Sequence, residues 1–270
     1  MYAYPGQSWS SKPTVDHVSA ANATWDMNAP VHRPKDAFDD ARQHTQQPIV
    51  TGTSVLGIRY KDGVMLAADT LASYGSLARF MDMDRLQKVG ENVVIGAGGD
   101  MSDWQYIKHM LSKLIQEQEN EEDGHILTPP QVYAYLSRVM YKRRSDMNPL
   151  WNALVVAGFD AKTSAPFLGY VDLLGTSYQS PTVATGFGLH LAQPMLRKAI
   201  EGREETLTED EARAILDDCM RVLYYRDARS LNRFYISTVT KDGVKQDGPH
   251  SVSTNWSFAE GLRGYGPQTQ

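Results

Sequence analysis

The chain has 270 residues, 41% of them hydrophobic, and a net charge of −5 at pH 7. This acidic balance argues against a nucleic-acid-binding surface, and no run reaches the roughly 18 apolar residues that a membrane helix needs. The single cysteine, Cys219, rules out an intrachain disulfide and fits a reducing compartment. We therefore expect no nucleic-acid or membrane partner, and a buried thiol.

Three parts of the chain differ in composition. Residues 1–44 carry Ser, Pro, Asn and Asp with scattered aromatic side chains and show neither a helical nor a strand period, which is typical of a disordered leader. Residues 45–248 combine apolar runs with turn signals, so we expect one compact domain there. Residues 249–270 have no core period and form a polar C-terminal extension.

The predicted elements of the domain come in groups of one type. Apolar runs rich in strand-forming residues predict strands at 54–60, 64–69, 93–99, 151–160 and 167–175, and a hairpin at 232–246. Helical spacing and cap residues predict helices from about 102, at 128–144, at 188–201 and at 209–225. Strands, two helices, strands, two helices and strands therefore follow one another. This order favours an α+β fold, a four-layer αββα sandwich, over a parallel sheet.

Thr53 comes directly before the first predicted strand. A threonine that is cut free at its own amino group acts as a nucleophile, with that amine as its base. Such a site also needs a carboxylate, a cation and backbone N–H donors for an oxyanion. Asp69 ends the second predicted strand and Gly98-Gly99 end the third. On pattern alone two interpretations stay open: Thr53 is a nucleophile, or Thr53 begins a strand and Asp69 caps a turn.

Several segments together resemble a known family. They are GTSVLGIRYKDGVMLAAD, GSLARF, GAGGDMSDWQY, MNPLWNALVVAGFD, FLGYVDLLG and YRDARSLNRF, and the resemblance covers nearly all of residues 45–258 in order. These segments are similar to the β subunits of the 20S proteasome. The resemblance implies the N-terminal-nucleophile hydrolase fold, which is a four-layer αββα sandwich.

Active members of that family use a threonine, an aspartate and a lysine at fixed spacing. Thr53 fits the first place, Asp69 the second, 16 residues later, and Arg85 stands at the lysine place, 32 residues after Thr53. Lysine presents a compact ammonium that tunes the proton transfer, whereas arginine is planar, bulkier and permanently charged. The exchange of lysine for arginine is therefore not conservative.

The resemblance assigns four further places. Gly99 matches the oxyanion donor, and Asp227 and Ser230 match an aspartate and a serine near the end of the family's site. Phe187 stands where active members have a serine that hydrogen-bonds the threonine amine, and phenylalanine cannot form that bond. The resemblance thus predicts a vestigial site whose scaffold is present and in which two working parts are replaced.

The resemblance also concerns the removal of the leader. It implies that a neighbouring active subunit cuts between His44 and Thr45, which leaves eight residues ahead of Thr53. Thr53 then has a peptide nitrogen in place of a free amine, and the nucleophile lacks its base. We therefore expect no catalytic residue and a non-catalytic structural β subunit. The alternative is an active N-terminal threonine endopeptidase subunit that uses Thr53.

The partners are also implied by the resemblance. They are the other α and β subunits of a 28-subunit particle that degrades proteins in the ATP- and ubiquitin-dependent pathway, in cytoplasm and nucleus. The C-terminal extension would contact the opposite β ring with Trp256 and Phe258 as anchors, because buried aromatic side chains dominate such contacts. No metal or organic cofactor is implied. A third class, a free-standing binding protein with this fold, predicts a monomer.

Overall fold

The computed structural model describes residues 47–203 and 205–259. The predicted leader at 1–44, and the part of the predicted extension from residue 260 onward, lie outside the described residues. Within the described ranges the elements follow the predicted order: seven strands, two helices, four strands, two helices and two strands. None of the helices described there is long and apolar enough to cross a membrane.

Three of the four described helices, α1, α2 and α4, begin after a polar cap residue, whereas α3 follows Phe187. They are α1 (Met101–Asn120), α2 (Pro129–Ser145), α3 (Gly188–Ile200) and α4 (Glu209–Arg226). The Asp100 carboxylate accepts the N–H groups of Ser102 and Asp103 at 3.0 and 3.1 Å, which satisfies two donors at the start of α1. Thr208 and Glu211 form a reciprocal capping box at the start of α4.

The strands form two antiparallel sheets. The eight-stranded sheet contains β1 (Val50–Gly52), β4 (Ala72–Tyr74), β5 (Leu77–Phe80), β6 (Leu86–Val89), β7 (Val93–Asp100), β8 (Asn152–Asp160), β9 (Ala165–Val171) and β10 (Ser177–Gln179). Its order is β10-β9-β8-β7-β1-β4-β5, and β6 also pairs with β7. The five-stranded sheet contains β2 (Val55–Tyr60), β3 (Gly63–Asp69), β11 (Thr182–Ala184), β12 (Phe234–Thr240) and β13 (Gly243–His250). Its order is β11-β2-β3-β12-β13.

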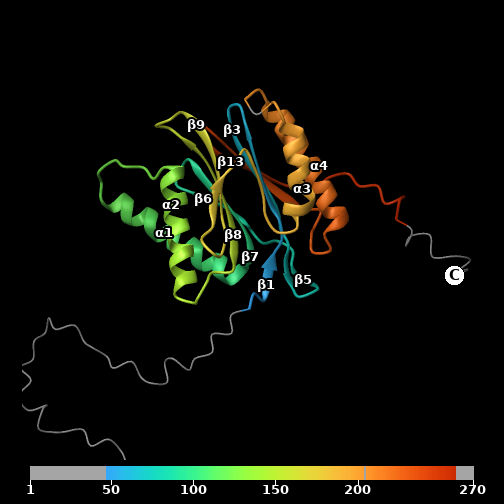
Figure 1. Ribbon diagram of the computed structural model, residues 1–270, viewed down its shortest axis with the longest axis horizontal. Coiled ribbons are helices and arrows are strands. Elements are labelled where there is room, and N and C mark those ends of the chain that lie inside the picture. The colour runs from blue at the N-terminus through green and yellow to red at the C-terminus, as the bar shows by residue number, and fades with distance from the viewer. Residues whose placement is uncertain (1–46, 204, 260–270) are drawn as a thin grey trace, which may run out of the picture. The chain divides into compact units, whose positions relative to one another are not determined.

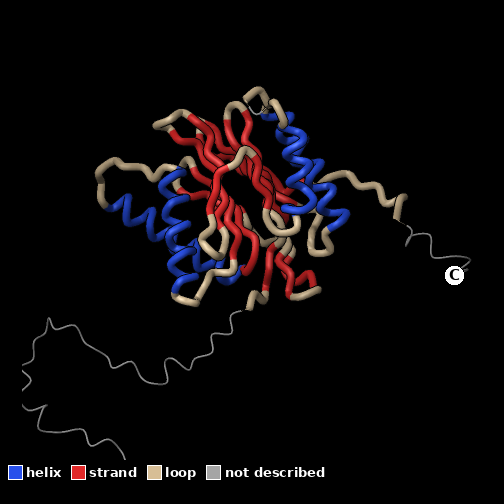
Figure 2. The backbone as a smooth tube through the Cα atoms, in the orientation of Figure 1, coloured by secondary structure: helices blue, strands red, loops and turns tan. Residues whose placement is uncertain are grey.

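The two sheets lie between the two pairs of helices, which makes four layers (Figure 1). Figure 2 shows the strands gathered between the two groups of helices. One apolar core joins α1 and α2 to the eight-stranded sheet through residues such as Trp104 and Ile95. A second core, which includes Leu216 and Ile58, joins α3 and α4 to the five-stranded sheet. The predicted α+β sandwich is therefore confirmed.

A third core lies between the sheets and explains the apolar runs of the sequence. In β3, Val64, Leu66 and Ala68 belong to the core between the sheets. Met65 and Ala67 alternate with them and belong to the core under α3 and α4. Successive side chains of a strand point to opposite faces. A strand with both faces covered therefore reads as a continuous apolar run rather than an alternating one.

Six short strands were not predicted, namely β1, β4, β5, β6, β10 and β11. The strand predicted at 167–175 also ends early, at Val171. The reason is a turn in which the Asp172 carboxylate accepts the N–H groups of Leu174 and Thr176 at 2.9 and 2.8 Å. At the other end of the domain, β13 continues to His250, two residues past the predicted boundary at 248.

Candidate functional site

Thr53 lies where the chain passes from one sheet to the other. β1 ends at Gly52 in the eight-stranded sheet and β2 begins at Val55 in the five-stranded sheet, so Thr53 and Ser54 form the link between them. Of the two interpretations left open, the one in which Thr53 begins a strand is therefore wrong. The physical reason is tertiary, because β1 has three residues and forms by pairing with β4 and β7, which are distant in sequence.

The hydroxyl of Thr53 is held by a carboxylate. Thr53 Oγ1 donates a hydrogen bond of 2.6 Å to Asp227 Oδ2. Asp227 follows α4, and its other oxygen accepts the Arg229 N–H at 2.9 Å, so the loop after the helix orients the carboxylate. In the uncut chain the Thr53 nitrogen belongs to the peptide bond with Gly52. A threonine nucleophile that takes its own amine as base therefore needs a cut before Thr53.

Asp69 and Arg85 form a buried ion pair beneath Thr53. Asp69 ends β3 and is 2% exposed. One of its carboxylate oxygens pairs with the Arg85 guanidinium, and the other accepts the Leu231 N–H at 2.9 Å. Burial raises the pKa of Asp69, while the Arg85 charge and the Leu231 hydrogen bond oppose that rise. Both oxygens of the Asp69 carboxylate are thus engaged, one by the Arg85 guanidinium and the other by the Leu231 backbone N–H.

Arg85 is 1% exposed and uses every donor that its side chain has. Nε donates to the Asp69 carbonyl at 2.9 Å, and Nη1 donates to the carbonyls of Thr53 and Ala97 at 3.0 and 3.2 Å. Nη2 donates to the Ser54 carbonyl at 2.9 Å and to the Asp69 carboxylate. A guanidinium has about five N–H donors, so none is left for the Thr53 hydroxyl. Through these hydrogen bonds Arg85 connects the Thr53–Ser54 segment with β3 and β7.

β1 occupies the slot between β7 and β4, directly ahead of Thr53. In this slot Gly52 faces Gly99 across the β1–β7 ladder. A Cβ at Gly52 would lie 2.5 Å from Arg85 Cδ, so glycine lets the arginine stem pass. Gly99 has φ of +90°, and a Cβ there would lie 2.1 Å from the Trp151 carbonyl oxygen. The close approach of neighbouring atoms therefore explains why both positions are glycine.

An open cleft of about 610 Å³ lies beside Thr53 and Gly99. Phe187 lines this cleft, precedes α3 and is 50% exposed. Its ring offers neither a donor nor an acceptor. Trp151 and Leu173 also line the cleft, together with Arg226, Asp227 and Arg229, so its wall carries both apolar and charged side chains.

Ser230 lies beside Thr53 and does not line the cleft. Its hydroxyl donates to the Asp227 and Leu223 carbonyls at 2.7 and 3.2 Å. Thr53, Asp69, Asp227 and Ser230 line a cavity of about 10 Å³, which is close to the space of one water molecule. The fold therefore gathers these four residues, with Arg85, Gly99 and Phe187 beside Thr53.

Two hydroxyl groups near Thr53 were not predicted. Ser54 Oγ accepts the Gly188 N–H at 2.8 Å, and Thr185 Oγ1 accepts the Val55 N–H at 2.9 Å. Both residues are buried, and they fix the link against the segment before α3. Ser54 adjoins Thr53 in sequence, but nothing in the sequence shows that residue 185 lies beside residue 55.

The other predicted residues lie elsewhere. His44 and Thr45, the predicted processing place, are outside the described residues. Trp256 and Phe258 pack against α4, with ring centroids 5.0 and 5.4 Å from that of Tyr225. Within 47–203 and 205–259, no three His, Cys, Asp or Glu side chains are grouped to hold a metal ion.

The layers and the site define a class of protein. It is an α+β sandwich of two antiparallel sheets between helix pairs, with a threonine at the crossing between the sheets and a buried ion pair beneath it. Residues 49–239 match the family model described as "Proteasome subunit". Because that match spans more than half of the chain, the chain belongs to the proteasome subunit family.

Individual relatives agree with the family model. The chain is 52% identical over 236 residues to "Probable proteasome subunit beta type-7" of Schizosaccharomyces pombe, covering 87% of this chain and 90% of the relative. It is 53% identical over 223 residues to "Proteasome subunit beta type-4" of Xenopus laevis, covering 83% and 91%. It is 47% identical over 234 residues to "Proteasome subunit beta type-7" of Saccharomyces cerevisiae, covering 83% and 87%. The predicted resemblance to proteasome β subunits is confirmed.

Proposed function

We propose that this chain is a non-catalytic structural β subunit of the 20S proteasome core, with the N-terminal-nucleophile hydrolase fold. One observation carries the proposal: all the donors of Arg85 are bonded to backbone carbonyls and Asp69. A catalytic cation beside Thr53 would have to stabilise charge at the reacting hydroxyl. Arg85 holds the backbone in place, and its charge is compensated by Asp69.

The position of β1 supports the same proposal. Val50–Gly52 pairs with β7 on one side and with β4 on the other, so this slot is filled by the chain itself. An extended peptide that bound there by adding a strand would have to displace β1. A cut at His44-Thr45 would leave β1 in place and Thr53 without a free amine.

The proposed role is architectural. The chain fills one place in a β ring, contacts α and β subunits of the same 28-subunit particle, and reaches the opposite β ring through its C-terminal extension. Trp256 and Phe258 support this last contact because they are 37% and 59% exposed, and exposed aromatic side chains favour protein interfaces. The names of the relatives support membership of the particle. The proposed location, cytoplasm and nucleus, rests on the resemblance alone.

The first residue of the mature chain tests the non-catalytic role. Intact-mass spectrometry of the purified particle is expected to show a start at or near Thr45. The same particle carrying Thr53→Ala is expected to keep every peptidase activity of the unaltered particle. A start at Thr53, together with loss of one activity in Thr53→Ala, would overturn the proposal.

One observation favours the alternative, an active threonine endopeptidase subunit. The Thr53 hydroxyl is already hydrogen-bonded to a carboxylate, Asp227, at 2.6 Å. Under this alternative, Asp227→Asn would abolish a peptidase activity of the particle in the same way as Thr53→Ala. The non-catalytic role predicts that neither substitution changes a peptidase rate.

A further inference from the structure

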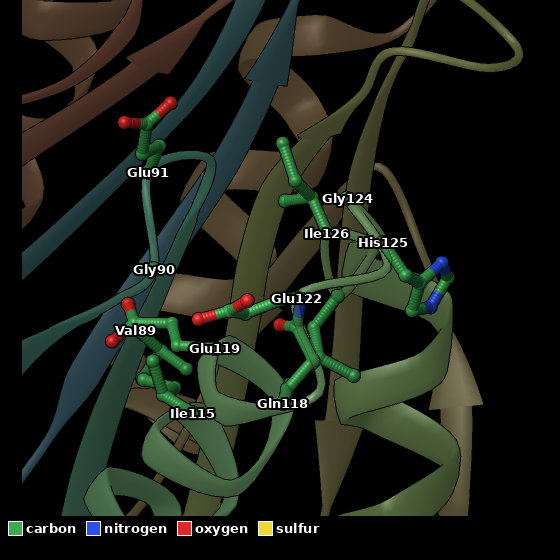
Figure 3. Close-up of a pocket in the computed structure, with 11 residues that line it drawn as sticks. Val89, Gly90, Glu91, Ile115, Gln118, Glu119, Glu122, Gly124, His125 and Ile126 are labelled. Atoms are coloured by element: carbon green, nitrogen blue, oxygen red, sulfur yellow. The ribbon is translucent and has the colours of Figure 1, made fainter.

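A cavity that shares no lining residue with the cleft beside Thr53 lies beside the turn between β6 and β7 (Figure 3). Its volume is about 470 Å³, within the usual range of ligand sites. Three segments line it: the β6–β7 turn, the C-terminal part of α1, and the loop that leads to α2. We call it the α1-end pocket, and its lining residues are Val89, Gly90, Glu91, Ile115, Gln118, Glu119, Glu122, Gly124, His125, Ile126 and Leu127.

The charged side chains of the α1-end pocket are of one sign. Glu91, Glu119 and Glu122 line it, and no Lys or Arg side chain does. None of the three carboxylates takes part in an ion pair within the part of the chain that the structure describes. In Figure 3 the carboxylates of Glu119 and Glu122 point toward the space below the turn, whereas the Glu91 carboxylate and the His125 ring point away from it. The pocket is therefore complementary to a cation.

The remaining wall of the α1-end pocket is apolar. Val89 is buried, Ile115 and Leu127 are partly buried, and all three line the pocket. Lysine and arginine side chains combine an apolar stem with a charged head. Such a side chain would pack its stem on these three residues while its head meets Glu119 or Glu122. The pocket thus fits the side chain of a basic residue better than it fits an inorganic cation.

The surroundings of the pocket point to a polypeptide as the occupant. Ile126 lies on the rim with 55% of its surface exposed. A second cavity, of about 250 Å³, opens on residues 124–127 together with Phe159 and Lys162. The loop at residues 124–127 therefore borders two cavities, and the apolar Ile126 side chain lines both of them. A small cation would leave Ile126 in water, whereas a polypeptide segment would cover it.

We propose that the α1-end pocket is a docking site for a segment of a neighbouring polypeptide chain in the assembled particle. The segment carries a Lys or Arg side chain, which enters the pocket, and an apolar residue close to it, which covers Ile126. This inference rests on the proposed function, because it takes the neighbouring chain to be another subunit. It adds a named contact surface and the chemistry of its partner.

Site-specific photo-crosslinking tests the docking site. The photoreactive residue p-benzoylphenylalanine replaces Ile126 in the full chain, and the particle is purified and irradiated. The expected adduct joins residue 126 to another subunit, at a segment with a Lys or Arg within a few residues of the adduct. Adding Glu119→Gln and Glu122→Gln to the same chain is expected to lower the yield roughly threefold or more, an order-of-magnitude figure for the loss of the charge pairing between the basic side chain and these carboxylates.

Two neighbouring carboxylates provide a matched control. Glu117 and Glu121 lie in the same stretch, residues 117–122, as Glu119 and Glu122 but do not line the pocket, and Glu117 pairs with Lys113. Glu117→Gln with Glu121→Gln removes the same charge from this stretch and is expected to leave the yield unchanged. Raised salt should lower the yield of the unaltered chain, because it screens charge pairs.

Each other outcome overturns the inference. These outcomes are an adduct to the leader or tail of this same chain, an adduct to a segment without a basic residue, no adduct, or equal losses in both pairs of variants. The inference rests on one part of the proposed function, membership of the particle, and failure of that part is distinguishable, because the altered and unaltered chains would then both be absent from the purified particle. A chain that is present in the particle without an adduct disproves the docking site alone.

Discussion

Arg85 shows at the scale of one residue how a site can keep its shape with a different side chain. It lies along the edge of β7 between β6 and β1, where carbonyl groups of both sheets converge. Its planar fork reaches four carbonyls and one carboxylate at once. A lysine has three donors on one nitrogen and cannot reach acceptors that are spread in this way. The arginine therefore stabilises the crossing between the sheets.

Arg85→Lys is expected to destabilise the domain. At least two of the five acceptors would lose their donor in a buried place, and each unsatisfied buried group costs about 1–3 kcal/mol. We expect the free energy of unfolding to fall by about 2–4 kcal/mol, measured by denaturant unfolding of the full chain.

Arg79→Lys is the control for this prediction. Arg79 is exposed and contacts the Phe80 ring at 5.2 Å, so its exchange should change stability by about 0.5 kcal/mol at most. Equal effects of the two exchanges would show that the hydrogen bonds of Arg85 contribute little.

At the scale of the elements, the long and doubly buried segments were predictable. Apolar runs mark β2, β3, β7 and β8, helical spacing marks all four helices, and polar caps mark the starts of α1, α2 and α4, because these signals come from neighbouring residues. The short strands β1, β4, β5 and β6 were not predictable in this way. Their three or four residues pair with partners supplied by the tertiary fold. The local sequence pattern does not indicate such pairings between distant segments.

The candidate site was likewise predictable only where the information comes from the local sequence or the family resemblance. The spacing of Thr53, Asp69 and Arg85 was readable once the family resemblance was seen, and the fold does bring these three together. The sequence did not show that β1 ends at Gly52 and β2 begins only at Val55, because β1 depends on long-range pairing.

Cys219 was predictable as an interior side chain. It is buried, and burial raises the pKa of its thiol to about 12.

The cap of α4 gives a prediction at this scale. Thr208 Oγ1 accepts the Glu211 N–H, and the Glu211 carboxylate accepts the Thr208 N–H at 3.0 Å. Thr208→Ala removes one half of this box and should lower the free energy of unfolding by about 1 kcal/mol. Thr208→Ser keeps a hydroxyl in the same place and should be close to neutral. A loss that is the same in Ser and Ala variants would point to the methyl group of threonine instead of its hydroxyl.

At the scale of the whole molecule, the tail after β13 is held against α4 and still presents aromatic surface. The Arg221 side chain donates to the Ser253 carbonyl at 3.1 Å, and the Tyr225 hydroxyl accepts the Asn255 N–H at 2.6 Å. These bonds direct the tail along α4 as far as Trp256 and Phe258. The domain thus offers a preorganised aromatic pair at its surface, which reduces the entropy lost on binding.

Trp256→Ala combined with Phe258→Ala is expected to weaken the joining of the two β rings. Aromatic anchors at the centre of an interface contribute about 2 kcal/mol or more each when they are truncated. The ratio of joined to unjoined rings should therefore fall by at least tenfold, a roughly 1.4 kcal/mol effect, as measured by native mass spectrometry of purified assemblies. Ser257→Ala, between the two aromatic residues, should leave the ratio unchanged, because the known contact of Ser257 uses its backbone N–H. If the double variant joins rings as well as the Ser257 variant does, the exposed aromatic pair has no role between rings, and the tail serves only to cover α4.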